Sequence, residues 1–564
     1  MSSISLQQRV ARLEDLQNLL SEQPYSIVLR LRLSLAYRDL GYPDLAVGDA
    51  YKALLLTDEV AEEGEFHDEA MSAVMEDFGS EQAAQLFATV ASQLGFEGLQ
   101  GAKASDDNDA TIWAQKYLSK IAYAILVSCL IDCGCLSSAF EYNTRAIQAY
   151  QDTPIFDRYR KTIQEKLQSY FKSRNEDFAE ADVDEYPDRG LVRREQYPWN
   201  TWEPDRFSEE SLNCMNEQMA AVAPKLEIKK TSLLLLAPET PNSCPQKDPI
   251  YVDQLGIFAK EDIAPGHLIL EEKSLLTAVA RLRETRCDAC SISLTKAGID
   301  SDDIRTCDEC DEIYFCSEEC HDLAQDTYHP ALCGVNIDQT VPASEASDYL
   351  YSLLLTRALA LAEVQESHPL ELKEVCFIWG DYHGVDVNQN WNMDSTDGVA
   401  DPFGSIPQTL PFSFKYNILT PLNVLEKMDI NIFTQSPRYD TWIFNTLYAK
   451  FRGTASARQG LDGRPEVSAV HPMWCMGNHS CDPNVSWDWE GSIRFWTREQ
   501  LVDWKGRDPS AKPGMQKGEE LRGHYCDVRL PVKERREWAV GALGGDCMCP
   551  RCVWEEAQER GQTS

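Results

Sequence analysis

Apolar residues recur at helical spacing from the beginning of the chain to about residue 172, which predicts helices throughout this region. One stretch carries a more specific pattern, because small residues there allow two antiparallel helices to approach closely, and a glycine opens the turn between them. The positions are Leu33, Ser34, Tyr37, Gly41, Ala46, Ala50 and Ala53. A weaker echo follows at Leu126, Gly134, Ala139 and Ala146.

These offsets resemble a tetratricopeptide repeat. The resemblance implies that residues 1–172 form a TPR-like helical domain, and that this domain offers a surface to protein partners. A plain helical hairpin is the alternative. The sequence specifies no peptide ligand for either.

Short strand-like segments replace the helical pattern from about residue 250 onward. Residues 257–259 and 267–270 predict two strands joined by a turn at Pro265 and Gly266. A cysteine-rich block and a largely helical block follow, and residues 349–363 form a clear amphipathic helix. Strand-like sequence returns between residues 467 and 552. We expect the early and late strands to form one domain that is split by two inserts.

A run of acidic residues separates the helical region from the strands. Seven acids lie between Arg174 and Arg189, with few large apolar residues among them: Glu176, Asp177, Glu180, Asp182, Asp184, Glu185 and Asp188. Such a run is typical of a solvated, mobile linker. A docking strip for a basic partner is the alternative.

The whole chain is also strongly acidic, with a formal net charge of -38 over 564 residues. This charge argues against direct nucleic-acid binding, because phosphate backbones attract basic surfaces. It favours either a basic partner or plain solubility. No apolar run approaches the roughly 20 residues that cross a bilayer, and the N-terminus lacks a signal peptide's apolar segment. We expect an intracellular protein, in the nucleus or the cytoplasm, where clustered cysteines bind metal rather than form disulfides.

Eight candidate metal ligands form a first cluster, in the pattern C-x2-C-x16-C-x2-C-x5-C-x3-C-x8-H-x3-C. They are Cys287, Cys290, Cys307, Cys310, Cys316, Cys320, His329 and Cys333. Two tetrahedral zinc ions require eight such ligands. A C-x2-C knuckle turns both sulfurs toward one metal, and the x3 spacings place two ligands one helical turn apart. A segment this small and polar would obtain its folding energy from the metal.

The spacing of the first cluster resembles a MYND zinc finger. The resemblance implies interleaved pairs, in which Cys287 and Cys290 join Cys316 and Cys320 on one zinc ion. The remaining four ligands, Cys307, Cys310, His329 and Cys333, would hold the other. It also implies a protein-interaction role, sometimes with proline-rich peptides. His321 falls outside the register, and we interpret it as a surface residue.

A second cluster lies near the end of the chain. Residues 478–484 read NHSCDPN, residues 518–521 read GEEL, and Tyr525 follows. The tail carries Cys547, Cys549 and Cys552, and three cysteines leave one tetrahedral position empty. Cys481 is the natural fourth ligand. A third zinc ion would therefore tie the tail to the Asn-His segment.

Together these motifs resemble the SET domain of protein lysine methyltransferases, and with the inserted finger they resemble the SET-and-MYND family. The resemblance covers roughly residues 250–555. It implies that S-adenosylmethionine is the methyl donor. Leu255, Gly256, Asn478 and His479 would bind this cofactor, and Tyr525 would orient the target amine beside the transferring methyl group. His524 points to the opposite face of its strand, and we do not assign it to the site.

Several positions depart from the family's pattern. Gln254 replaces the first glycine of a Gly-x-Gly motif, and Gly453 lies in a stretch that lacks the family's usual asparagine. Leu543 stands where an aromatic residue usually lines the lysine channel, with Trp538 nearby, and Gly477 replaces a bulky residue. These departures support the alternative function, a weak or inactive scaffold that binds partner proteins. A zinc hydrolase is disfavoured, because all twelve proposed ligands complete closed four-ligand sites.

The fold class we expect is multidomain α+β, with N-terminal all-α repeats followed by a split, β-rich SET fold. The predicted divisions are 1–172 for the helical repeats, 173–245 for an acidic linker and connector, 246–286 for the first part of the SET domain, 287–333 for the MYND finger, 334–465 for a helical insert, 466–530 for the second part of the SET domain, and 531–564 for a zinc-binding tail.

Overall fold

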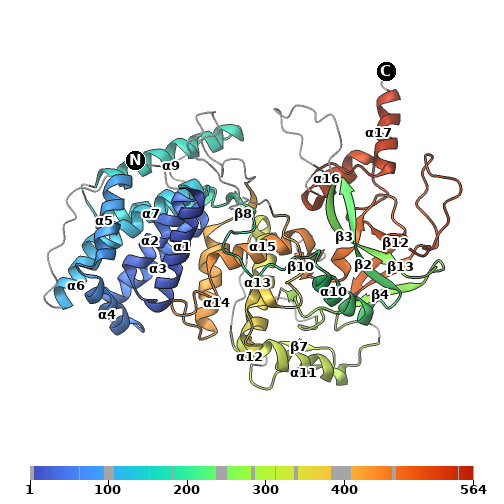
Figure 1. Ribbon diagram of the computed structural model, residues 1–564, viewed down its shortest axis with the longest axis horizontal. Coiled ribbons are helices and arrows are strands. Elements are labelled where there is room, and N and C mark those ends of the chain that lie inside the picture. The colour runs from blue at the N-terminus through green and yellow to red at the C-terminus, as the bar shows by residue number, and fades with distance from the viewer. Residues whose placement is uncertain are drawn as a thin grey trace. The chain divides into compact units, whose positions relative to one another are not determined.

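The computed structural model describes the chain except for residues 1–4, 63, 95–106, 152, 179–182, 235, 237–250, 281–285, 297, 311–312, 336–340, 383–407, 460–464, 544 and 563–564 (Figure 1). The chain folds into two compact units, each built from two stretches of sequence. Unit 1 comprises residues 1–200 and 381–449, and unit 2 comprises residues 201–380 and 450–564. The α+β class predicted from the sequence is confirmed. Every helix in the described part of the chain is too short or too polar to span a bilayer.

Helices dominate the described part of unit 1 (Figure 1). They are α1 (Leu6–Glu22), α2 (Ile27–Asp39), α3 (Pro43–Ala61), α4 (His67–Asp77), α5 (Glu81–Leu94), α6 (Asp107–Trp113), η1 (Ala114–Leu118), α7 (Ser119–Asp132), α8 (Leu136–Ala149), α9 (Pro154–Ser173), η2 (Val183–Glu185), η6 (Lys415–Leu419), α14 (Thr420–Lys427) and α15 (Thr441–Thr454), whose last turn belongs to unit 2. Helix α1 shows how local sequence sets the start of a helix and its buried face. Ser5 caps it in a capping box with Gln8, and Leu6, Val10, Leu13, Leu16 and Leu20 are buried along one face.

Two helical hairpins in unit 1 have the same turn. Gly41 lies between α2 and α3, and Gly134 lies between α7 and α8, each with φ of 79°. The next residue donates its N–H to a carbonyl five positions back, from Tyr42 to Tyr37 and from Cys135 to Leu130. This bond is the mark of a Schellman turn, which requires a left-handed residue. The hairpins are consistent with the predicted repeats, and their tetratricopeptide character stays a prediction.

The second stretch of unit 1 packs into the helical core. Strand β8 (Gln408–Phe412) pairs antiparallel with β1 (Gly190–Arg193). Lys52 Nζ lies 3.2 Å from Asp440 Oδ1, and Asn445 donates to Asp44 at 2.8 Å. Because these side chains are buried, residues 408–449 are part of the core of unit 1. The stretch expected as one helical insert, 334–465, is thus shared between the two units.

Unit 2 contains short strands that join distant parts of the chain. They are β2 (Leu226–Leu234), β3 (Tyr251–Ala259), β4 (Leu268–Glu272), β5 (Thr277–Val279), β6 (Arg305–Thr306), β7 (Tyr314–Phe315), β9 (Ser456–Gln459), β10 (Pro465–Ala469), β11 (Asn478–His479), β12 (Val485–Glu490), β13 (Ser492–Thr497) and β14 (Arg522–Gly523). The described sheets run β2-β3, β5-β10-β9, β12-β13-β4, β11-β14 and β6-β7. Early strands therefore pair with late ones, β4 with β13 and β5 with β10, around a shared core that includes Leu255, Ile269 and Phe495.

Unit 2 also contains helices. They are α10 (Glu209–Val222), η3 (Ser301–Asp303), α11 (Glu318–Thr327), α12 (His329–Leu332), η4 (Ala343–Glu345), α13 (Ala346–Val364), η5 (Pro369–Glu371), η7 (Trp474–Met476), α16 (Val532–Leu543) and α17 (Pro550–Gln562). Two of these helices carry a ligand cysteine: Cys320 lies in α11 and Cys552 in α17. The helix predicted at 349–363 is present within α13, which packs on β5 and β10. Its amphipathic character is corrected, because residues 352–362 are buried on every side.

The segment expected as an acidic linker is largely folded where the structure describes it. It contains η2, β1, α10 and β2, and β2 pairs along its whole length with β3. Leu226 and Ile228 are buried and Glu227 between them is partly exposed, which is the alternation of a strand with one face on a core, whereas Lys229 and Lys230 beyond them are both exposed. Glu180 and Asp182 of the acidic run lie outside the described residues.

Candidate metal sites and active site

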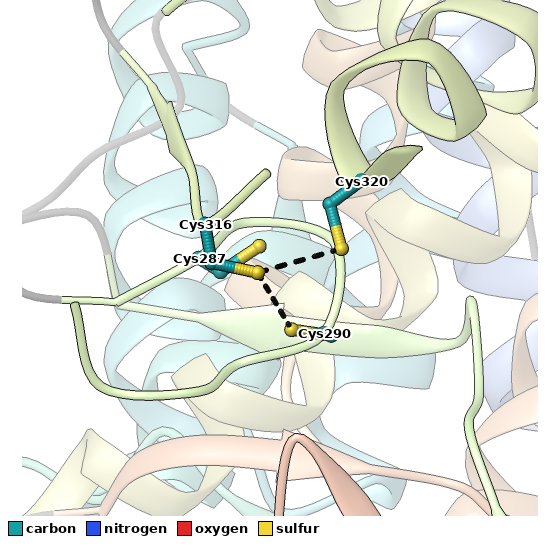
Figure 2. A group of neighbouring side chains, drawn as sticks. All are labelled: Cys287, Cys290, Cys316 and Cys320. Atoms are coloured by element: carbon teal, nitrogen blue, oxygen red, sulfur yellow. Dashed lines mark hydrogen bonds between the residues drawn. The ribbon is translucent and has the colours of Figure 1, made fainter. Parts of the chain in front are cut away.

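The first tetrad gathers four cysteines from a loop and from the entrance of α11. Cys287 and Cys290 lie before β6, Cys316 follows β7, and Cys320 lies in the first turn of α11. Figure 2 shows their sulfur atoms turned toward one another; Cys316 Sγ lies 3.7 Å from Cys290 Sγ and 3.6 Å from Cys320 Sγ. Tetrahedral zinc with sulfur ligands at about 2.3 Å places the sulfurs about 3.8 Å apart. The tetrad therefore fits one zinc ion.

The second tetrad is the other half of the interleaved pattern. Cys307 Sγ lies 3.8 Å from Cys333 Sγ, and Cys310 Sγ lies 3.7 Å from His329 Nε2. The four ligand atoms all fall within 4.8 Å of one another. The grouping of the eight ligands is the one the family resemblance implies. His321 is outside both tetrads, and its ring pairs with Asp322 instead.

A buried ion pair attaches the finger to the rest of unit 2. Asp288, between two ligands of the first tetrad, accepts from Arg357 of α13 and from the hydroxyl of Tyr328, each at 2.8 Å. The guanidinium of Arg357 also lies over the ring of Tyr328, 3.6 Å from its centroid. All three side chains are buried, so the orientation of the finger on α13 is fixed by charge and stacking together.

The third tetrad joins the NHSC motif to the tail. Cys481, Cys547, Cys549 and Cys552 place their sulfurs within 4.8 Å of one another, and three of the four are buried. Two arginines donate hydrogen bonds to members of the tetrad. Arg535 of α16 donates to Cys552 Sγ at 3.4 Å, and Arg551 of α17 donates to the carbonyl of Cys481 at 2.8 Å. Cationic donors suit zinc-bound thiolates, which keep negative charge on sulfur.

A further group overlaps the third tetrad, and the sequence did not reveal it. The ligand atoms of His479, Cys481 and Cys526 also lie within 4.8 Å of one another. His479 Nε2 lies 3.3 Å from Cys481 Sγ. The only sequence signal for Cys526 was its place directly after Tyr525, which is too common an arrangement to single out one thiol.

Three chain segments meet at the Asn-His motif. Strand β11 runs parallel to β14, with Asn478 opposite Arg522 and His479 opposite Gly523. The side-chain amide of Asn478 donates to the carbonyl of Leu255 at 2.9 Å and to Glu520 Oε1 at 2.7 Å. The motif is thereby fixed to β3 on one side and to the GEEL segment on the other.

The hydroxyl and the backbone of Tyr525 are both held by the motif. Its hydroxyl donates to the carbonyl of Gly477 at 3.0 Å, and its N–H donates to His479 Nδ1 at 3.1 Å. The two rings lie 5.1 Å apart between centroids. Burial lowers the pKa of His479 to about 4, so its ring is neutral at pH 7. His524 faces the other way and stacks on Trp487.

The structure gives physical reasons for two of the departures from the family pattern. Gln254 turns its side chain back, accepting from the N–H of Leu255 at 3.0 Å and from Arg206 at 3.3 Å. At Gly477 an added Cβ would lie 3.1 Å from Leu521 Cδ2 and 3.3 Å from the carbonyl of Trp474. A side chain at position 477 would therefore be tightly packed, and Leu521 would have to shift by a few tenths of an ångström to admit it.

The two remaining departures lie elsewhere. Leu543 packs against the apolar cluster around the tail cysteines, and Trp538 is 63% exposed. Gly453 lies in the last turn of α15.

No protein-family model matches the chain. Two curated proteins are similar to it. SET domain and MYND-type zinc finger protein 6 from Schizosaccharomyces pombe is 22% identical over 307 residues, which are 53% of this chain and 49% of that protein. A SET and MYND domain-containing protein from Dictyostelium discoideum is 27% identical over 106 residues, 19% of this chain and 18% of that protein. The match thus spans about half the length of the first relative and less of the second. The resemblance to SET and MYND proteins is confirmed.

Proposed function

We propose that this chain is an S-adenosylmethionine-dependent protein-lysine N-methyltransferase. Its motifs resemble those of SET and MYND proteins, and both curated proteins that are similar to it carry that name. The observation that carries the proposal is the meeting of β3, the Asn-His motif and Tyr525 at one place. Asn478 is hydrogen-bonded to Leu255 of β3, and Tyr525 is hydrogen-bonded to Gly477 and His479, the two neighbours of Asn478 in the chain. The assignment of a protein substrate with a target lysine rests on the family resemblance.

The groups at this place suit a cationic cofactor. The carbonyl oxygens of Leu255 and Gly477 face the Asn-His motif and Tyr525, and the nearby carboxylate of Glu520 is shared between Asn478 and Arg522. S-adenosylmethionine would supply a methyl group on a positively charged sulfur, and electronegative oxygens favour such a charge. In this proposal Leu255 and Gly256, with Asn478 and His479, hold the cofactor. Because both ring nitrogens of His479 already have partners, its contact would come from the backbone.

Tyr525 is the proposed catalytic residue. Its hydroxyl donates to the carbonyl of Gly477, and a phenol oxygen can accept a hydrogen bond as well as donate one, so it would accept from the target amine. A neutral amine held in that way presents its own lone pair in line with the methyl group. The residue therefore acts by orienting the nucleophile.

The test replaces Tyr525 with phenylalanine. We expect Tyr525→Phe to lower methyl transfer at least about 100-fold, because the hydroxyl that orients the amine is removed. Cofactor binding by calorimetry and the zinc content of three ions should remain. Full activity of the variant on every substrate tested would contradict the role of Tyr525.

An inactive scaffold is the second candidate function. It is favoured by Leu543, which packs among the tail cysteines and supplies no aromatic side chain, and by Gln254 in the glycine motif. In that case the finger and the helical hairpins would bind protein partners. Tight, stoichiometric binding of S-adenosylmethionine by the full chain would count against it.

A further inference from the structure

His479 is held at both ring nitrogens by partners that belong to different sites. Nδ1 accepts the backbone N–H of Tyr525 at 3.1 Å, and Nε2 lies 3.3 Å from Cys481 Sγ. Cys481 is a member of the third tetrad, and Tyr525 is the proposed catalytic residue. One half-buried side chain, His479, therefore lies between the metal site and the tyrosine.

The hydrogen-bond partners decide where the proton of the ring lies. A backbone N–H is always a donor, so Nδ1 must present its lone pair to Tyr525. A neutral imidazole carries one proton, and that proton is then on Nε2, facing Cys481 Sγ. A zinc-bound thiolate keeps lone pairs that accept such a donor, so the contact is an N–H···S hydrogen bond to a metal ligand.

The same geometry argues against His479 as a metal ligand. The group with Cys481 and Cys526 has ligand atoms close enough for a second ion. However, Nε2 could bind a metal only as a bare nitrogen. In a neutral ring the proton would then lie on Nδ1, which could no longer accept the N–H of Tyr525. Keeping that hydrogen bond would require the doubly deprotonated imidazolate.

We propose that His479 is a positioning residue that couples occupancy of the third zinc site to the backbone of Tyr525. Zinc fixes Cys481 Sγ, the sulfur fixes the ring through Nε2–H, and the ring fixes the N–H of Tyr525 and packs beside its phenol. The consequence for catalysis rests on the proposed function, whereas the link from zinc to the Tyr525 backbone does not.

Substituting His479 with asparagine or with glutamine tests its two hydrogen bonds separately, the one to Tyr525 and the one to Cys481. Asparagine places a carbonyl oxygen near the position of Nδ1, and glutamine places an amide nitrogen near that of Nε2. His479→Asn should keep the acceptor for Tyr525 and lose the donor to Cys481. His479→Gln should do the reverse, and His479→Ala should lose both.

The test measures zinc release and amide exchange on the full chain. Chelator competition with metal analysis gives the number of ions and their loss rates, and hydrogen exchange gives protection of the Tyr525 amide. We expect three zinc ions in the native chain. In His479→Asn and His479→Ala one of them should be released at least about 10-fold faster. The Tyr525 amide should exchange faster in His479→Gln and His479→Ala, and keep its protection in His479→Asn.

His321→Asn is the matched control, because His321 follows a zinc ligand in sequence but belongs to no tetrad. It should change neither readout. Native zinc retention in His479→Asn, native protection in His479→Gln, or a fourth bound ion would overturn the proposal. None of these measurements requires methyl transfer, so a failure of the proposed enzymatic function would be seen separately, in the activity of the native chain.

Discussion

At the scale of single residues, the missing side chain of Gly256 shows how closely the site is packed. A Cβ at this position would lie 2.6 Å from Glu520 Oε1 and 3.1 Å from Asn478 Nδ2. Those two atoms are themselves hydrogen-bonded to each other at 2.7 Å. A methyl group would therefore have to separate a pair that fixes the Asn-His motif.

We expect Gly256→Ala to lower the stability of unit 2 by about 1–3 kcal/mol, because the Asn478–Glu520 hydrogen bond is strained or lost. Cofactor binding should weaken with it. Gly523→Ala in β14 is the control, since its Cβ would make only an ordinary contact, 3.6 Å from Phe495 Cε1. Thermal unfolding of both variants measures the difference, and equal melting temperatures would refute the argument.

The sequence revealed the metal ligands because cysteine and histidine spacing is itself the signal. It did not reveal Cys526 or Arg535, because each is a common residue whose importance comes from a neighbour distant in sequence. It placed Glu520 in the GEEL motif but did not predict its hydrogen bond to Asn478. The roles of Tyr525 and the cofactor residues came only from resemblance. The structure adds their contacts, such as the bond between the Tyr525 hydroxyl and Gly477, which no spacing predicts.

At the scale of elements, the tail helices depend on the third tetrad. Helix α16 contributes Arg535 and α17 contributes Cys552, and both are buried against the tetrad. The apolar cluster beneath them is small, with Val532 and Ala539 as its principal aliphatic members. So small a core supplies little burial energy, and metal binding supplies the remainder.

Removing one tail ligand should therefore release the tail. We expect Cys549→Ser to reduce the zinc content from three ions to two and to make proteolytic cleavage of residues 531–564 at least about 10-fold faster. Cys214→Ser is the control, because Cys214 is exposed on α10 and belongs to none of the metal groups. If the tail of Cys549→Ser resisted protease like the native chain, zinc would not be what holds it.

The sequence predicted where strands exist more reliably than it predicted their partners. The strands at 257–259 and 267–270 are present as parts of β3 and β4. The partner of β3 is β2, in a segment whose acidic beginning pointed to a linker. A strand pairs with whichever strand edge still has unpaired backbone N–H and C=O groups beside it in the folded chain. The local alternation of apolar and polar residues does not identify that edge.

At the scale of the whole molecule, unit 1 is assembled from two stretches separated by unit 2 sequence. The buried pair of Lys52 and Asp440 is one of its internal links, with the side chains 1% and 11% exposed. Without Asp440, the buried ammonium would have to share the one remaining carboxylate, Asp49, with Arg30.

We expect Asp440→Ala to destabilise unit 1 by about 3–5 kcal/mol, because Lys52 loses its directly bonded carboxylate and two buried cations, Arg30 and Lys52, are left with Asp49 alone. The zinc content, which belongs to unit 2, should stay at three ions. Glu165→Ala is the matched control, since its pair with Lys161 is exposed and should contribute less than about 1 kcal/mol. Helix content followed by circular dichroism during heating measures both, and similar curves would contradict the prediction.

The pairing of β4 with β13 can form only late in synthesis, after most of the chain has left the ribosome. The two strands are about 220 residues apart along the chain. A ribosome adding roughly 5–20 residues per second needs roughly 10–40 s to cover that distance. During this interval β4 has emerged without its partner, while all eight ligands of the first cluster are already available to bind zinc. The nascent chain must therefore complete its finger early and keep an open strand edge from aggregating until the second half of the domain arrives.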